Sequence, residues 1–124
     1  MTIVPVQASE DNASTITPEK VAVARLASLR AMGTVATARP WERWLFDGGT
    51  SPAQKQPWLI VTPDDLTIEI VFDPDMSLAR VRRVLMRLLA DRWNLVVRVH
   101  PTVVPEAITT LGDLPLRVDR WDRI

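Results

Sequence analysis

The sequence predicts an α+β fold, a two-layer sandwich in which helices accompany a mainly antiparallel sheet of three or four strands. Three observations favour this class. Two segments have helical periodicity, several short segments have the residue pattern of strands, and residues 67–100 run strand, helix, strand. With 124 residues, 47% of them hydrophobic and 24% charged, the chain is long enough and apolar enough to bury a core.

The first sixteen residues are predicted to form an arm. Residues 7–15 are small, polar and weakly acidic, so they offer little surface to bury. We expect residues 1–16 to be flexible or ordered by a partner, and residues 17–124 to form a single α+β domain. The opening residues also lack the basic and apolar regions of a signal peptide, so we expect a cytoplasmic protein.

The first helix is expected over residues 18–32. The Thr17 hydroxyl can cap the free amides of the first turn, and Pro18 suits the first helical position because it has no N–H to leave unpaired. Gly33 is placed to end the helix. Apolar residues surround most of the circumference between Val21 and Met32, which predicts a helix that is buried or sandwiched between two surfaces.

Residues 34–56 combine structure-breaking prolines and glycines with a tryptophan-rich cluster. A short helical turn beginning at Pro40 would place Trp41 and Trp44 on one side. Because tryptophan and arginine are enriched in interface hot spots, Trp41, Arg43 and Trp44 are a candidate partner-binding site. The alternative is that both rings pack under the loop as a satellite core.

A hairpin is expected over residues 58–72, followed by a second helix over residues 76–92. The hairpin consists of an apolar strand, a turn at residues 63–65, and an alternating strand that places Ile68, Ile70 and Phe72 on one face. Apolar residues of the second helix recur at helical spacing, which predicts an inner stripe of Leu78, Val81, Leu85, Leu88 and Leu89.

Two further strands are expected, over residues 95–99 and 114–118. In the first of them, Val96, Arg98 and His100 face away from the core. The segment between the strands has room for a single helical turn, and residues 119–124 are a polar tail with one aromatic. If residues 2–6 were also a strand, the order would match a ferredoxin-like βαββαβ domain. We keep this as the alternative fold, although Pro5 would then interrupt a central strand.

The outward side of the second helix carries Arg80, Arg83 and Arg87. Three guanidinium groups on one helix face can neutralise the phosphates of a nucleic acid or contact an acidic partner. The alternative is a solvated face in which Asp91 pairs with Arg87. The formal net charge is zero, from 15 Lys+Arg and 15 Asp+Glu, so nucleic-acid binding would depend on this local patch.

The sequence carries no recognisable catalytic, cofactor or metal signature. It has no cysteine, and its paired glycines lack the Lys-Ser/Thr of a phosphate-binding loop. The single histidine, His100, is interpreted as a strand-end residue. The aspartates at residues 64, 65, 73 and 75 fit turns and helix capping better than a calcium loop. We therefore expect no enzyme, no metal and no small-molecule cofactor.

The function expected from these features is binding of a macromolecule, foremost a protein, as an accessory, adaptor, inhibitor or assembly subunit. The arm, the Trp/Arg loop and a proline-rich C-terminal third favour a protein partner or a homo-oligomer over a membrane. Two alternatives from other classes stay open. One is a nucleic-acid-binding module that uses the arginine face, and the other is an enzyme whose carboxylate site forms only in the fold.

Overall fold

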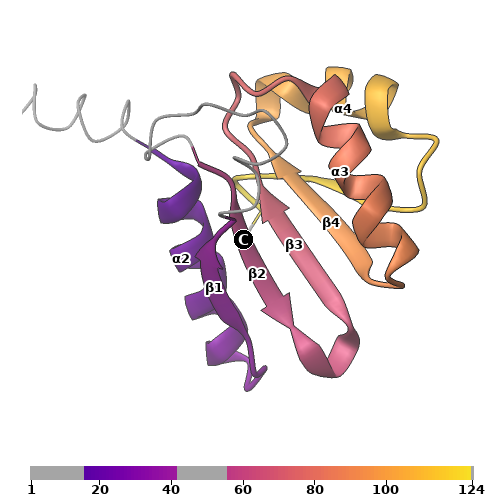
Figure 1. The fold of residues 1–124 in the computed structure, drawn as a ribbon. Coiled ribbons are helices and arrows are strands. Elements are labelled where there is room, and N and C mark those ends of the chain that lie inside the picture. Colours follow the sequence, from indigo (N-terminus) through magenta and orange to yellow (C-terminus); the bar gives the residue numbers. More distant parts are fainter. Residues whose placement is uncertain (1–15, 42–55, 124) are drawn as a thin grey trace, which may run out of the picture.

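The computed structural model describes residues 16–41 and 56–123. At its centre is a five-stranded mixed sheet with the order β1-β2-β3-β4-β5 (Figure 1). None of the helices in these two ranges is long and apolar enough to cross a membrane. The elements are α2 (Pro18–Ala31), β1 (Thr37–Pro40), β2 (Trp58–Thr62), η3 (Pro63–Asp65), β3 (Thr67–Val71), α3 (Leu78–Ala90), β4 (Asn94–Val99), η4 (Pro101–Val103), α4 (Val104–Leu111) and β5 (Arg117–Arg120).

The sheet confirms the α+β class and corrects its details. Strands β1, β2 and β3 are antiparallel neighbours, whereas β3, β4 and β5 are parallel neighbours. The prediction of a mainly antiparallel sheet of three or four strands is therefore wrong. The reason is that α3 and α4 each carry the chain back to the end of the sheet where the preceding strand began, and such a crossover makes the next strand parallel.

Helices cover both faces of the sheet, so the predicted two-layer arrangement is also wrong. Successive residues of a strand point to opposite faces. Accordingly, Leu59 and Ile70 belong to a core cluster with α3 and α4, while Ile60 and Val71 belong to a second cluster with α2. Figure 1 shows α2 beside β1 and β2, and α3 with α4 over the other end of the sheet. Because β2 and β3 present apolar residues on both faces, both faces need a cover.

Several elements lie where the local sequence signals predicted them. The hairpin over residues 58–72 is confirmed by the antiparallel pairing of β2 with β3. Helix α2 begins after Thr17, whose Oγ1 accepts a hydrogen bond from the Lys20 amide at 3.3 Å. It ends before Gly33, which has a φ of 80° that favours glycine. Helix α3 is shorter than the predicted 76–92, and β4 extends the predicted strand 95–99 by one residue.

Three elements differ from the predictions. Residues 104–111 form the two-turn helix α4 instead of a single turn, and β5 occupies Arg117–Arg120 instead of residues 114–118. Strand β1 falls in the segment expected to lack regular structure. It includes Pro40, and proline is tolerated there because β1 is at the edge of the sheet.

The ferredoxin-like alternative is wrong as well. Three strands stand between α2 and α3, where a βαββαβ order has two. The predicted strand at residues 2–6 and all but Ile16 of the predicted arm lie outside the described residues.

Candidate functional site

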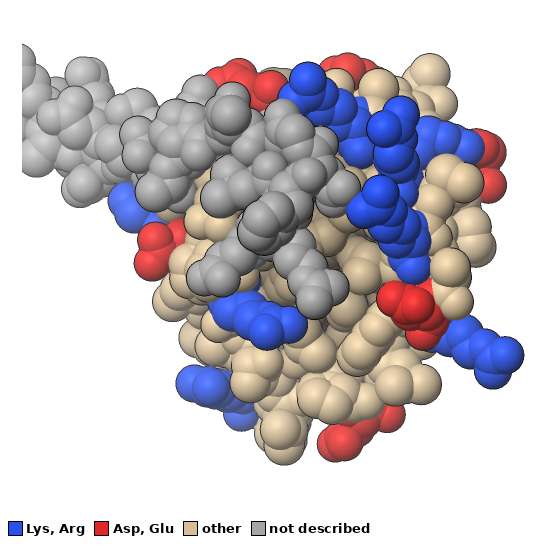
Figure 2. All heavy atoms as spheres, in the orientation of Figure 1, with Lys and Arg blue, Asp and Glu red and all other residues tan. Residues whose placement is uncertain are grey.

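The predicted arginine face lies on the outward side of α3. Its inner stripe is in place, with Leu78, Val81 and Leu85 buried and Leu88 and Leu89 packed at the margin of the core. Arg80, Arg83 and Arg87 are consequently exposed. Figure 2 shows basic side chains gathered over the region of α3. Helix α3 contains no acidic residue, so its outer face presents positive charge along its length.

Arg82 is next to the arginines of this face in sequence, but its guanidinium bonds to residues at the end of α4. Its Nη2 donates to Oδ2 of Asp113 at 2.7 Å, and its Nη1 donates to the Thr110 carbonyl at 3.1 Å. These bonds connect α3 to the end of α4. The hydrogen bond from Arg82 lowers the pKa of the Asp113 carboxyl, and the same bond raises the pKa of Arg82.

Of the predicted partner-binding cluster, only Trp41 is within the described residues. Trp41 is 7% exposed, and its ring centroid lies 6.5 Å from that of Phe72 in the core cluster beside α3 and α4. Its amide donates to the Pro57 carbonyl at 2.8 Å, which continues the pairing of β1 with β2. Arg43 and Trp44 lie outside the described residues, so the clustering of the three side chains stays a prediction.

Helix α2 exposes an apolar surface that the sequence indicated only indirectly. Buried residues such as Ala22 and Leu29 point to the sheet. On the opposite side, Val23 is 53% exposed and is followed at four-residue spacing by exposed alanines. We call this side the α2 outer face; it comprises Ile16, Val23, Ala24, Ala27 and Ala31, together with the charged Lys20 and Arg30. Met32 and Val35, just beyond the helix, are also exposed.

The inner side of α2 covers a buried group of charges. Glu69 of β3 is 4% exposed and Arg98 of β4 is 1% exposed. Glu69 accepts from Nε of Arg98 at 2.6 Å and from Nε of Arg25, on α2, at 3.0 Å. Arg98 was predicted to face away from the core, and the predicted alternation of the hairpin strand puts Glu69 on the face opposite Ile68 and Ile70. Both charged side chains do so, but α2 covers that face and excludes them from water.

Arg98 also holds the C-terminal segment against the sheet. Its Nη1 donates to the carbonyls of Arg123 at 3.0 Å and Arg120 at 3.4 Å, and it lies 3.7 Å from a carboxylate oxygen of Asp119. The segment is held again at Trp121, whose indole N–H donates to the Phe72 carbonyl at 3.1 Å. This chemistry is structural, because the guanidinium is surrounded by acceptors of the same chain.

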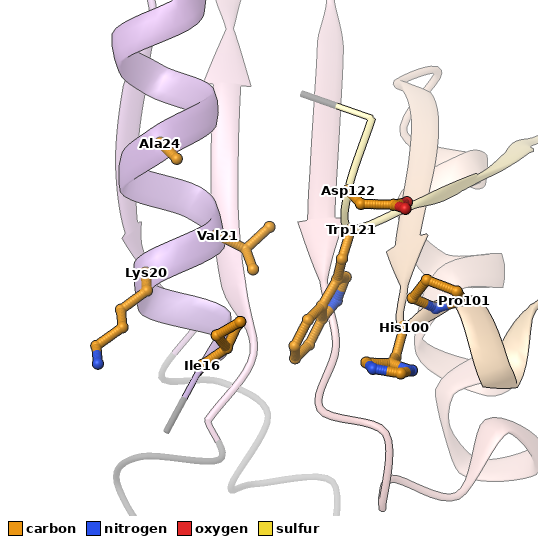
Figure 3. A pocket seen from close by; sticks show the side chains of 8 residues that line it. All are labelled: Ile16, Lys20, Val21, Ala24, His100, Pro101, Trp121 and Asp122. Atoms are coloured by element: carbon orange, nitrogen blue, oxygen red, sulfur yellow. The ribbon is translucent and has the colours of Figure 1, made fainter. Parts of the chain in front are cut away.

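A pocket of about 390 Å³ opens between the first turns of α2 and the C-terminal segment. Figure 3 shows α2 on one side and the Trp121 and His100 rings on the other. Apolar side chains form most of its wall. The residues that line it are Ile16, Lys20, Val21, Ala24, His100, Pro101, Trp121 and Asp122.

His100 has a defined hydrogen-bond arrangement at this pocket. Its Nδ1 accepts from the Thr102 amide at 3.2 Å and lies 2.8 Å from the Thr102 hydroxyl. A backbone amide can only donate, so this contact assigns the lone pair to Nδ1 and the hydrogen of the neutral ring to Nε2. The ring also meets the Trp121 ring edge to face, at a centroid distance of 5.6 Å.

Metal ligands do not gather in the described ranges: no three histidine or carboxylate side chains of residues 16–41 and 56–123 could hold an ion together. Comparison with protein-family models, curated proteins and solved structures finds no match to this chain.

The pocket could not be found from sequence, because its two walls come from segments far apart in the chain, residues 16–24 and residues 100–122. The buried charges had one signal, a charged residue inside each of two apolar strands. The α2 outer face was indicated by the apolar circumference of its helix.

Proposed function

We propose that this chain is a non-enzymatic protein that binds another protein through the α2 outer face, as an accessory, adaptor, inhibitor or assembly subunit. One observation carries the proposal. Of the seven large hydrophobic side chains that are exposed in the described residues, four lie on α2 or its flanks: Ile16, Val23, Met32 and Val35. The other three are scattered: Leu66 lies between η3 and β3, Met86 is on α3 and Ile108 is on α4.

The side chains of the α2 outer face are suited to packing against a helix or a sheet of a partner protein. Alanines at residues 24, 27 and 31 allow a partner backbone to approach closely, while Val23 and Ile16 supply apolar area. A 14-residue helix is about 21 Å long. A typical stable interface buries roughly 800 Å² on each partner, more than the side of such a helix provides. The contact would therefore extend past the C-terminal end of α2, where Met32 and Val35 are exposed.

The test is a pair of charge substitutions on the α2 outer face, Val23→Lys with Ala27→Lys. Lysine has good helix propensity, so the helix should persist. Sedimentation or light scattering would report self-association. Affinity capture from the source cells, with the wild-type and variant chains compared side by side, would report a different protein partner. We expect the variant to lose the associated mass or the captured protein.

Met86→Lys is the matched control, because Met86 is 51% exposed on α3, on the other face of the sheet. It should retain whatever the wild-type chain binds. A wild-type chain that is monomeric and captures nothing would reject the proposal, and so would a partner that is lost equally in the control.

A second candidate function, nucleic-acid binding, is favoured by the exposed arginines of α3. Arg80, Arg83 and Arg87 are exposed on a helix without acidic residues. Three such groups would make the affinity fall steeply with salt, by a slope of about 1 in log–log form for each phosphate contact.

The discriminating measurement is a salt series with a labelled duplex and a labelled single strand. Replacement of all three arginines by glutamine should reduce the slope by about 3. Arg39→Gln, an exposed arginine on β1, should leave the slope unchanged. Absence of binding at low salt would remove this candidate and leave the α2 proposal untouched.

A further inference from the structure

The pocket between α2 and the C-terminal segment has the size and lining of a small-molecule site. Its volume, about 390 Å³, lies within the range of roughly 300–1,000 Å³ that is typical of ligand pockets. Val21 and the buried Trp121 ring contribute apolar walls from two elements that the fold holds in place. This pocket is separate from the buried Glu69–Arg98 group and from the arginines of α3.

Few polar groups line the pocket, and His100 supplies a hydrogen-bond donor among them. His100 offers Nε2–H, because its Nδ1 is occupied by Thr102. Lys20 also lines the pocket, but Figure 3 shows its ammonium group turned away from Trp121 and His100. The one lining carboxylate, Asp122, is engaged elsewhere, because both of its oxygens accept from Arg120, at 2.8 and 2.7 Å. Figure 3 shows the Asp122 carboxylate turned away from α2.

An apolar pocket with a donor and an occupied acceptor is complementary to an apolar ligand that carries an acceptor. We infer that this pocket binds a small aromatic carboxylate, whose ring packs against Trp121 and Val21 and whose carboxylate accepts from Nε2–H of His100. A flat ring matches an edge or face of the indole, and hydrogen bonds to an ionised acceptor are stronger than those to a neutral one. This inference goes beyond the proposed protein binding and is argued from other observations, although Ile16, Lys20 and Ala24 belong both to the α2 outer face and to the pocket lining.

The experiment uses two probes of the same ring, 2-naphthoate and 2-naphthylmethylammonium, with the full chain. Two-dimensional amide NMR reports the Trp121 indole N–H and the amides of Val21 and Ala24 individually. We expect 2-naphthoate at millimolar concentration to shift these signals in a saturable way. The ammonium probe, which carries donors instead of acceptors, should bind at least about tenfold more weakly.

Two substitutions of His100 separate its structural role from its contact with the ligand. In His100→Asn the side-chain oxygen can still accept from the Thr102 amide, but the Nε2–H donor is gone. In His100→Gln the amide nitrogen can replace the Nε2–H donor, while the acceptor at the Nδ1 position is lost. Binding of 2-naphthoate should fall about tenfold in His100→Asn and be largely kept in His100→Gln, with NMR dispersion confirming that both variants fold.

Ala24→Trp provides a second, independent variant, because a large side chain at the α2 wall should fill the pocket and abolish binding of both probes. Three outcomes would overturn the inference. They are no change at Trp121, equal affinity for the two probes, and 2-naphthoate affinity that is unaffected by both His100→Asn and Ala24→Trp.

Discussion

Glu69 and Arg98 show that a charged strand residue needs a partner when another element covers its face of the sheet. A charged side chain on an exposed sheet face needs no partner, whereas one with 4% or 1% exposure must be paired and hydrogen-bonded. The two carboxylate oxygens of Glu69 accept from Arg25, and one of them also accepts from Arg98. The group therefore joins α2, β3 and β4 through a single carboxylate.

Replacement of Glu69 by glutamine should destabilise the fold strongly. Removal of one member of a buried ion pair leaves an uncompensated charge and typically costs about 3–5 kcal/mol. Urea unfolding would measure the change. A double replacement, Glu69→Leu with Arg98→Met, should cost less than the sum of the two single changes. Arg117→Gln is the control, because Arg117 is exposed and the cost should stay within about 0.5 kcal/mol. Equal stabilities for Glu69→Gln and Arg117→Gln would contradict the account.

The Arg82–Asp113 contact predicts that part of the free energy of unfolding is lost at acidic pH. Arg82 lowers the pKa of Asp113 in the folded state. The pair therefore contributes its full stability at pH values above about 3.9, the pKa of aspartate in an unfolded chain. This contribution is lost as the pH falls through the lower folded pKa. Carboxyl ¹³C NMR of Arg82→Gln should show Asp113 titrating closer to 3.9.

A matched control for this titration is Arg120→Gln, since Arg120 lowers the pKa of Asp122 by the same kind of hydrogen bond. That variant should move the Asp122 titration and leave Asp113 where it is. The interpretation fails if Asp113 titrates identically in the wild type and in Arg82→Gln.

At the scale of elements, α4 decides the direction of the last strand. Its buried residues Ala107 and Leu111 pack into the core beside α3. The chain therefore crosses over the sheet before it enters β5, and β5 runs parallel to β4. Helix α4 ends at Leu111 and is capped by Gly112, whose amide donates to the Ile108 carbonyl at 2.9 Å.

Gly112→Ala should loosen this end of α4. A Cβ at this position would overlap the backbone carbonyl oxygen of Ile108, which cannot rotate away as a side chain would. We expect a cost of about 1–3 kcal/mol, as for other overpacked positions, and faster amide exchange in α4. Glu106→Ala, an exposed change in the same helix, should alter stability by less than about 0.5 kcal/mol. If Gly112→Ala is as stable as the wild type, the turn accommodates the added Cβ without cost and the prediction is wrong.

At the scale of the whole molecule, the C-terminal segment completes the core that lies between α2 and the sheet. Trp121 is 5% exposed and packs in the same cluster as Val21 and Ile60. Its amide donates to the Val99 carbonyl at 2.9 Å. The segment that looked like a polar tail is thus an integral part of the core and one wall of the pocket.

Deletion of residues 121–124 should therefore unfold or severely weaken the protein. Loss of a buried tryptophan costs about 3–5 kcal/mol, and the deletion also removes the Arg123 carbonyl that Arg98 binds. Trp121→Phe keeps most of the ring and loses the bond to Phe72, so it should cost about 1–3 kcal/mol. Thermal and urea unfolding would rank the three chains. A deletion variant as stable as the full chain would refute this role of the segment.

The sequence by itself determined the elements whose signals are local. The cap at Thr17, the glycine at residue 33, the alternation of β3 and the leucine stripe of α3 each arise from neighbours within a few residues, and each is found in the structure. The α+β class followed from them. Short elements with weak local signals, β1 and α4, were missed because they depend on contacts with other elements: β1 pairs with β2, and α4 packs against α3 and β5.

Only the tertiary structure decided the parallel strands, the cover on both faces and the sites. Strand direction depends on where a crossover helix packs, and α4 was not evident in residues 102–113. The burial of Glu69 and Arg98 depends on α2, which is more than forty residues away from Glu69 in the chain. The pocket combines the first turns of α2 with His100 and Trp121. These features require contacts between distant segments, which local periodicity and capping do not encode.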